Sequence, residues 1–300
     1  MRSATKAALS GDRITSDMIL TFYGVRGSVP APGSHTVKYG GNTPCIHLDT
    51  GADFHLVLDS GTGIIELGEQ LVKDHKPIYL LLSHNHWDHI QGFPFFKPAY
   101  QKNRQIHILP GLTRPMQPRA ILNQMTGSLF PVPSGQLGAD IKVMASPAPH
   151  IPISIGELTI TRRILNHPGG GSAYLIDNQQ HRFAYITDNE LFPPGPVNTS
   201  LEQWQEFTRE LDLLIHDAQY FPDDFPAKSG WGHTCYESVI ELAIAAGVRH
   251  LCLFSHDHRR SDDEIEQMLA RVSSEIRRQK APLEAFAARE QNSFILGKHG

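Results

Sequence analysis

The chain has few cysteines and no long apolar stretch. Only three of its 300 residues are cysteines, Cys45, Cys235 and Cys252, and they are far apart. An odd, dispersed set argues against a disulfide framework. No apolar run approaches the roughly 18 residues that span a bilayer, and the basic N-terminus has no apolar stretch behind it, as a signal peptide would. These absences predict a cytoplasmic protein without a membrane partner.

The chain also lacks an excess of positive charge. It has 27 Lys and Arg against 31 Asp and Glu, for a formal net charge of −4. A protein that binds nucleic acid stably would be expected to present a basic surface, so no such partner is expected. Hydrophobic residues make up 40% of the chain, which is enough for a sizeable core. The oligomeric state does not follow from these numbers, and a homodimer stays open.

Short apolar runs separated by turn-rich stretches predict many strands and a few helices, arranged in mixed α/β layers. The predicted strands cover residues 18–23, 45–48, 55–58, 78–82, 106–109, 158–165, 173–176, 183–187, 211–215, 250–254 and 293–296. Helices are expected over 63–74 and near 115–125, and after two capping-box sequences that begin at Thr234 and Ser261.

The domain organisation is predicted to be simple. Residues 1–17 form a polar leader that need not be ordered, and residues 18–300 form one domain. Within it, residues 92–152 are rich in proline and are interpreted as an insertion over one face. Their aromatic stretch, Phe93–Tyr100, could contact substrate or pack in the core, and core packing is the preferred reading.

Three histidines and an aspartate lie within six residues, His84-Asn85-His86-Trp87-Asp88-His89. The run follows the predicted strand 78–82, so it should form a loop at the end of that strand. Imidazole and carboxylate are the ligands that suit zinc and its first-row neighbours, and the compact spacing lets one loop serve two ions. The alternative is a solvated histidine-rich loop.

Other predicted strands also end in a potential ligand. His167 follows the strand 158–165, Asp188 follows 183–187, and His256 follows the strand that ends at Phe254. Strand ends at one edge of a sheet are where α/β proteins assemble their sites. Four strands that deliver ligands to one edge favour a metal site over a solvated loop.

The order His-x-His-x-Asp-His, then His, Asp and His, resembles the metallo-β-lactamase superfamily. The resemblance implies a four-layer αββα sandwich with two Zn²⁺ ions at one edge of the two sheets, where Mn²⁺ or Fe could replace zinc. It also implies a distribution of the ligands: His84, His86 and His167 for one ion, Asp88, His89 and His256 for the second, and Asp188 as a bridge. Asp59 would orient the metal loop, although it could equally cap the helix that follows it.

One segment resembles the ribonuclease Z branch and its small phosphodiesterase relatives. Asp217 lies in the segment Leu213–Ala218, just after the predicted strand 211–215, and His233 precedes a predicted helix. In that branch an acidic residue and a histidine at these places donate a proton to the leaving group. The alternative for His233 is packing beside Thr234, and His216, on the opposite face of the strand, is expected to be structural.

The glycine-rich segments 23–30 and 39–43 resemble a bacterial group of uncharacterised superfamily hydrolases. Within them Arg26 is a candidate phosphate contact and Asn42 a candidate substrate contact, although Arg26 could also be a surface turn residue. The long basic arm with which ribonuclease Z clamps transfer RNA has no counterpart in this sequence. A small phosphodiester, such as a cyclic nucleotide, is therefore preferred to transfer RNA as the substrate.

The sequence thus predicts a dinuclear metal-dependent phosphodiesterase. The ions would activate a water for attack on phosphorus, Asp88 and Asp188 would hold the ions and orient that water, and His233, oriented by Asp217, would protonate the leaving oxygen. Three alternatives remain: a carbon-ester hydrolase of the thioesterase, lactonase or β-lactamase type, a tRNA-processing endonuclease, and a non-catalytic binding module.

Overall fold

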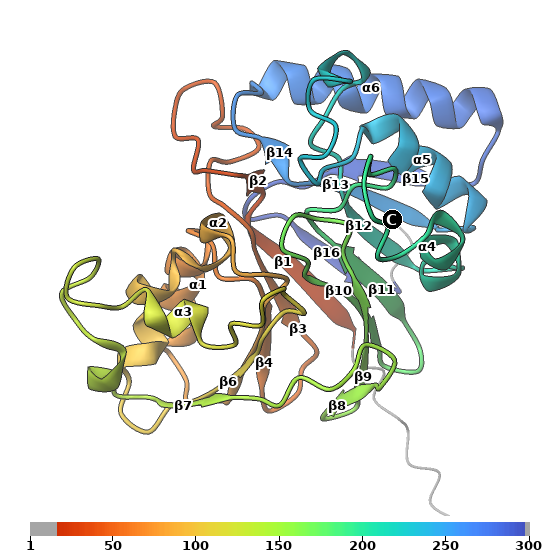
Figure 1. Ribbon diagram of the computed structural model, residues 1–300. Coiled ribbons are helices and arrows are strands. Elements are labelled where there is room, and N and C mark those ends of the chain that lie inside the picture. Colours follow the sequence, from red (N-terminus) through yellow and green to blue (C-terminus); the bar gives the residue numbers. More distant parts are fainter. Residues whose placement is uncertain (1–16, 298–300) are drawn as a thin grey trace, which may run out of the picture.

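Two seven-stranded sheets face each other in the computed structural model, which describes residues 17–297 (Figure 1). In spatial order the first sheet contains β16 (Ser293–Leu296), β1 (Met18–Gly24), β3 (Cys45–Asp49), β4 (His55–Leu58), β5 (Ile78–Leu81), β6 (Gln105–Leu109) and β7 (Asp140–Val143). The second contains β15 (Glu284–Ala287), β13 (His250–Phe254), β12 (Leu213–Asp217), β11 (Arg182–Ile186), β10 (Ser172–Asp177), β9 (Leu158–Ile164) and β8 (Ile153–Ile155). A two-stranded ribbon pairs β2 (Arg26–Gly27) with β14 (His256–Asp257). The polar leader expected over residues 1–17 lies outside the described residues, apart from Asp17.

Helices cover the outer face of each sheet. The first sheet carries α1 (Ile64–Leu71), α2 (Trp87–Ile90), α3 (Ala120–Asn123) and the short 3₁₀ turns η1 (Phe93–Phe95), η2 (Lys97–Tyr100) and η3 (Ser134–Gln136). The second sheet carries α4 (Leu201–Phe207), α5 (Tyr236–Ala245), α6 (Asp262–Gln279) and the 3₁₀ turn η4 (Pro222–Asp224). The order of layers is αββα, which confirms the predicted fold class.

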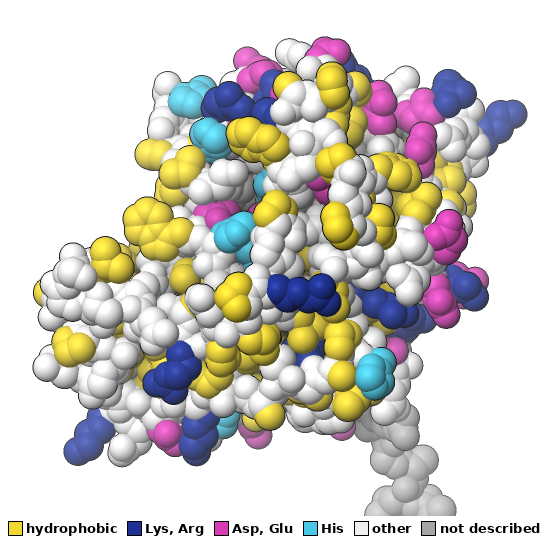
Figure 2. Space-filling view, viewed as in Figure 1, with side chains coloured by type: hydrophobic (Ala, Val, Ile, Leu, Met, Phe, Trp, Pro, Cys, Tyr) yellow, Lys and Arg dark blue, Asp and Glu magenta, His cyan; other side chains and the backbone are white. Residues whose placement is uncertain are grey.

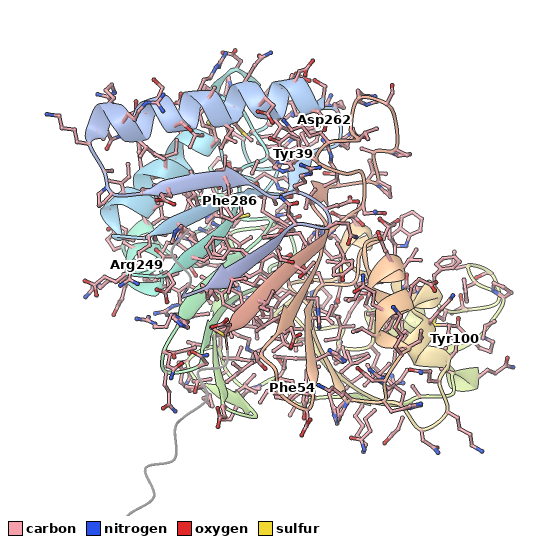
Figure 3. All side chains as sticks on the ribbon, turned by 180° about the vertical axis from the view of Figure 1, so that it is seen from behind. Tyr39, Phe54, Tyr100, Arg249, Asp262 and Phe286 are labelled. Carbon is pink, nitrogen blue, oxygen red and sulfur yellow. The ribbon has the colours of Figure 1, made fainter. Side chains whose placement is uncertain are left out.

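Alternation along the strands explains these layers. Leu56 and Leu58 of β4 point into the cluster between the sheets, whereas Val57 points outward to the cluster under α1. Across the interface, Phe254 of β13 lies against Phe22 of the first sheet, with ring centroids 6.3 Å apart. Seen from behind, side chains of both sheets fill the space between them (Figure 3). Each sheet therefore buries both faces and needs a helical layer outside.

The two capping-box predictions had different outcomes. Ser261 caps α6: its Oγ accepts from the backbone N–H of Glu264, whose carboxylate accepts from the N–H of Ser261. The prediction for Thr234 is wrong, because the N-cap of α5 is Cys235, without a side-chain cap. Thr234 Oγ1 instead donates to the carbonyl of Asn189 and accepts from Leu191 N. The Thr234 hydroxyl thereby holds the loop after β11.

The proline-rich stretch 92–152 belongs in part to the sandwich itself. It supplies β6 and β7 to the first sheet, while the helix expected near 115–125 is limited to α3. Phe93 and Phe96 are fully buried in the outer core, and Phe95 is more than half exposed. Two of the four aromatic rings of the stretch 93–100 therefore pack in the core beside α1, while Phe95 and Tyr100 are exposed. Among the described residues, no helix is both long and apolar enough to cross a membrane.

Candidate metal centre

The site forms where several strands end at one edge of the sandwich. His84 follows β5, His167 follows β9 and Asp188 follows β11, as their sequence positions predicted. In the space-filling view, histidine and acidic side chains gather near the middle of the face that is turned toward the reader (Figure 2). His84, His167 and Asp188 are all buried.

Asp188 is the point on which the histidines converge. Its Oδ2 atom lies 3.3 Å from Nε2 of His89, 3.7 Å from Nε2 of His84 and 3.9 Å from Nε2 of His167. His86 completes the group, because its Nδ1 is 3.0 Å from His167 Nε2. One donor atom from each of His84, His86 and His167 lies within 4.8 Å of the others, and the same holds for His84, His89 and Asp188. The structure therefore brings five of the predicted ligands together.

Three of these histidines are oriented by hydrogen bonds at the far side of the ring. Nδ1 of His84 contacts Ser83 Oγ at 3.0 Å, and Nδ1 of His167 contacts the carbonyl of Gly232 at 2.9 Å. Nδ1 of His89 contacts Asp59 Oδ2 at 2.9 Å. With the proton held on Nδ1, each ring turns the lone pair of Nε2 toward Asp188, which is the form that binds a metal.

The donors fit a divalent cation. Within the described chain, Nε2 of His84 and of His89 are buried without a hydrogen-bond partner, although buried polar atoms are normally paired. Burial lowers the pKa of His84 well below its usual value and that of His167 to about 4, so both rings are neutral. Burial alone would raise the pKa of Asp188, but nearby His89 and His233 hold it well below its usual value. Imidazoles around a carboxylate are the ligand set of zinc and related ions.

Asp59 holds the loop that carries His84 and His89. Its buried carboxyl group accepts from the backbone N–H and the hydroxyl of Ser83, at 2.6 and 2.7 Å, from His89 Nδ1, and from the hydroxyl of Tyr185 at 2.8 Å. It does not cap α1, whose N-cap is Gly63. Sequence reasoning did not identify Ser83 or Tyr185, because neither is a metal ligand and Tyr185 comes from the opposite sheet.

Asp88 lies on the side of His89. Its Oδ2 is 3.2 Å from His89 Nε2 and accepts from the backbone N–H of Ser28 at 2.9 Å. Burial alone would lower the pKa of His89, but Asp88, Asp188 and Asp59 together raise it well above its usual value. Three carboxylates around one imidazole form a negative pocket that a cation would neutralise.

His256 is not placed with the other predicted ligands. Its Nε2 contacts the carbonyl of Ala288 at 2.9 Å, and its ring lies edge-on to Tyr39 with centroids 5.7 Å apart. The preceding residue, Ser255, is the one that faces the centre, with its Oγ 3.5 Å from Asp188 Oδ1. Successive side chains at a strand end point in opposite directions, so an error of one residue moves the predicted ligand out of the site.

His233 and Asp217 form a hydrogen-bonded pair at the rim of this cluster. His233 Nδ1 lies 2.6 Å from Asp217 Oδ2, and Asp217 also accepts from the backbone N–H of Gln219 at 2.9 Å. A ring nitrogen of His233 lies within 4.8 Å of donor atoms of both His167 and Asp188. Burial alone would lower the pKa of His233, but the charges of Asp217 and Asp188 raise it to about 9.

Two neighbours of this pair have structural contacts. His216 is buried on the other side of β12, where its Nδ1 contacts the carbonyl of Asp217, and burial lowers its pKa to about 4. Glu190 accepts from the backbone N–H groups of Gly230 and Gly232 at 3.0 Å and so fixes the loop that carries His233. The sequence offered no signal for Glu190, since its partners are backbone atoms.

Arg26 and Asn42 do not reach the centre. Arg26 is fully buried, and its guanidinium donates to the carbonyls of Gly40 at 2.7 Å and Arg260 at 2.7 Å. The backbone N–H and the side chain of Asn42 both donate to the Glu290 carboxylate, at 2.6 and 3.0 Å. The expected phosphate and substrate contacts are therefore corrected: both side chains are already engaged within the protein.

Replacing Arg26 with alanine should destabilise the protein without changing substrate affinity. The variant leaves buried carbonyls without a donor and removes the 3.7 Å contact with Asp262, which lies beside Tyr39 in Figure 3. We expect a loss of about 3 kcal/mol in the free energy of unfolding, measured in urea. A KM that rises tenfold in the folded variant would contradict this role.

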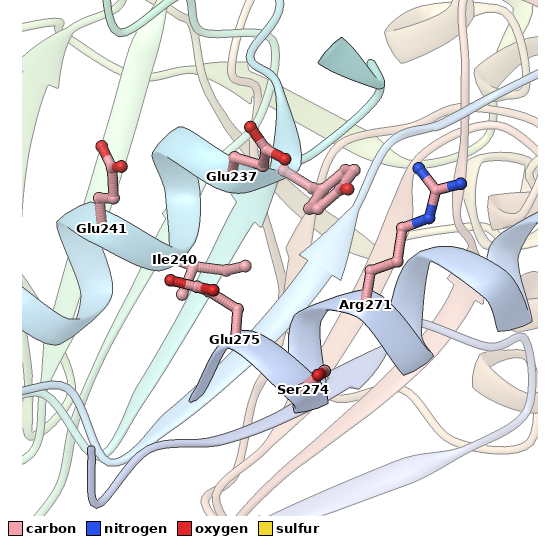
Figure 4. Close-up of a pocket in the computed structure, with 7 residues that line it drawn as sticks. Glu237, Ile240, Glu241, Arg271, Ser274 and Glu275 are labelled. Carbon is pink, nitrogen blue, oxygen red and sulfur yellow. The ribbon is translucent and has the colours of Figure 1, made fainter. Parts of the chain in front are cut away.

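Two small cavities flank the cluster. One of 190 Å³ lies beside His233 and is lined in part by Phe192 and Phe225. The other, of 200 Å³, lies beside His84 and His86 and includes Arg114. A larger cavity of 460 Å³ lies between α5 and α6 (Figure 4), and no residue that lines it belongs to the cluster.

Comparison with known proteins gives one family match. Residues 46–256 match the sequence profile of the Beta-lactamase superfamily domain. No protein in the curated set matches the sequence.

Solved structures share the fold at low sequence identity. YhfI from Bacillus subtilis, a metallo-beta-lactamase fold protein, is 20% identical over 93% of this chain and 99% of its own, with a TM-score of 0.67. The short form of human tRNase Z is 15% identical over 94% of this chain and 100% of its own, with a TM-score of 0.62. A diphosphatase from the PhnP family is 16% identical over 92% and 97%, with a TM-score of 0.63.

Proposed function

This chain belongs to the beta-lactamase superfamily, and we propose that it is a dinuclear metal-dependent phosphodiesterase that acts on a small phosphodiester such as a cyclic nucleotide. The observation that carries the proposal is the His233–Asp217 pair, held within reach of Asp188 and His167. A metal-dependent hydrolase of carbon esters has no need of such a pair, whereas an alkoxide that leaves phosphorus does.

The cluster would hold two ions. His84, His86 and His167 with Asp188 would hold one, and Asp88 and His89 with Asp188 would hold the other. Zinc suits the histidines, and Mn²⁺ or Fe are the alternatives. When bound, such ions polarise phosphoryl oxygens and lower the pKa of water to near neutrality.

His233 would act as the general acid. The Asp217 carboxylate, whose Oδ2 lies 2.6 Å from Nδ1, stabilises the protonated form of the ring and raises its pKa. The bond from Nδ1 to Asp217 fixes the ring, so that its other nitrogen is the one that can give a proton to the departing oxygen. Asp217 is a positioning residue, because it acts through His233.

The cavities support a small substrate. The pocket beside His233 has aromatic walls, Phe192 and Phe225, which suit an apolar or aromatic leaving group. The pocket beside His86 includes the guanidinium of Arg114, which suits an anionic group. Two of the solved structures with this fold are named a tRNase and a diphosphatase, which supports phosphorus chemistry.

A substrate panel tests the proposal. Purified protein, analysed for its metals, would be assayed with an aryl phosphodiester, 2′,3′- and 3′,5′-cyclic nucleotides, a thioester and a β-lactam. We expect turnover of phosphodiesters that a chelator abolishes and added Zn²⁺ or Mn²⁺ restores. Turnover of the thioester or lactam alone would favour the carbon-ester alternative and overturn the proposal.

A further inference from the structure

The two halves of the metal centre differ in their donor atoms. The half around His167 offers three imidazoles, from His84, His86 and His167, together with Asp188. The half around His89 offers one imidazole and the carboxylates of Asp88 and Asp188. Within the described residues, no second imidazole contributes to the half around His89, since His256 is turned toward Ala288.

The hydroxyl of Ser255 and the side-chain amide of Gln219 lie on the side of the His89 half where a second imidazole was predicted. The buried Ser255 hydroxyl lies 3.5 Å from Asp188 Oδ1 and 3.3 Å from Gln219 Oε1. Gln219 is itself buried, and its Nε2 donates to Ser28 Oγ at 3.4 Å. Ser28 in turn donates its backbone N–H to Asp88. The hydroxyl and the amide are thus connected to both carboxylates of this half.

The backbone leaves room for these oxygen atoms. A Cβ at Gly27 would lie 2.5 Å from both Gln219 Oε1 and Ser255 Oγ, closer than a Cβ atom approaches other heavy atoms. Ser255 itself has a φ of 58°, a left-handed conformation that is uncommon away from glycine. Glycine at position 27 and the turn at Ser255 therefore place both oxygen atoms beside Asp188.

We propose that the centre is chemically unequal: the three-histidine half holds zinc tightly, and the half with Ser255 is a weaker, oxygen-rich site that favours Mn²⁺. Imidazole suits zinc, whereas carboxylate and neutral oxygen donors suit harder ions such as Mn²⁺. Ser255, through its hydroxyl, sets this difference. The inference rests on the metal centre of the proposed function and not on which ester is hydrolysed.

Metal content after dialysis tests the inference. Apoprotein would be loaded with Zn²⁺, Mn²⁺ or both and dialysed against metal-free buffer. The bound ions would be counted by mass spectrometry and Mn²⁺ followed by electron paramagnetic resonance. We expect one zinc per chain after dialysis of the sample loaded with Zn²⁺ alone, and one zinc plus one manganese when a zinc-loaded sample is dialysed instead against buffer that contains Mn²⁺ in moderate excess.

Substitutions at Ser255 should change only the second ion. Ser255→His should make the chain retain two zinc ions, because it supplies the missing imidazole. Ser255→Ala should weaken Mn²⁺ binding about tenfold in titration calorimetry and leave the first zinc unchanged. The alanine variant keeps the test valid if the larger histidine side chain prevents folding.

His256→Gln is the matched control, since it changes the neighbouring side chain that faces away from the centre. It should leave the metal content unchanged, with circular dichroism to confirm the fold. Two zinc ions retained by the wild type, or zinc lost from folded His256→Gln, would overturn this inference alone. Failure of every folded variant to bind any metal would overturn the proposed function as well.

Discussion

Replacement of Asp188 with alanine is expected to abolish binding of the second ion, to weaken retention of the first, and to lower kcat/KM by about a thousandfold, since several kcal/mol of charge stabilisation depends on the bound ions. The Asp188 carboxylate lies 3.3–3.9 Å from Nε2 of three histidines, so both halves of the centre lose the same ligand. Metal content by mass spectrometry and steady-state kinetics on an aryl phosphodiester would measure the two effects.

The control for Asp188→Ala is Asp177→Ala, at the other end of the second sheet. Asp177 is half-buried and pairs with Arg182 at 3.5 Å, far along β10 from the metal ligands. The Asp177→Ala variant should have the same metal content and activity as the wild type. An Asp188→Ala protein that binds as many ions as the wild type, and as tightly, would show that the cluster is not the metal centre.

Asp59→Ala is expected to have the largest effect on stability. The substitution leaves four buried donors without an acceptor: the N–H and hydroxyl of Ser83, Nδ1 of His89 and the hydroxyl of Tyr185. Because Tyr185 belongs to β11 and Ser83 follows β5, the change also removes one of the hydrogen-bonded connections between the two sheets at the metal edge. The free energy of unfolding should fall by about 3–5 kcal/mol.

Urea unfolding in the presence of a chelator measures this effect in the metal-free protein. Asp49→Ala is the control, because Asp49 ends β3 in the same sheet but is exposed and accepts only from the N–H of Gly51. Its effect should stay within about 0.5 kcal/mol. A loss below 1 kcal/mol in Asp59→Ala would show that its hydrogen bonds do not hold the loop.

Features with a local signal could be predicted from the sequence. Apolar runs marked eleven strands of the two sheets, and the Ser261 capping box marked the start of α6. Short or polar strands such as β7, β8 and β15 have no such signal, because pairing with a neighbour and not their own pattern makes them strands. The αββα order followed from the family resemblance.

Features set by distant contacts could not be predicted. His167 and Asp188 were found because each follows an apolar strand, but no pattern decides between Ser255 and His256, whose orientations depend on the turn at φ 58°. The role of Arg26 depends on the carbonyls of Gly40 and Arg260, which are brought to it only by folding. An arginine in a glycine-rich turn looks the same in the sequence whether it binds phosphate or backbone.

The leaving-group dependence of His233→Ala tests the central claim most directly. The measured quantity is kcat/KM for two phosphodiesters that differ only in the leaving group, one a nitrophenol and one an alkyl alcohol. If His233 gives its proton to the departing oxygen, the variant should lose about a hundredfold or more on the alkyl ester and less than tenfold on the nitrophenyl ester. Equal losses on both esters, in a variant that keeps its metal, would contradict the assignment of His233 as the general acid.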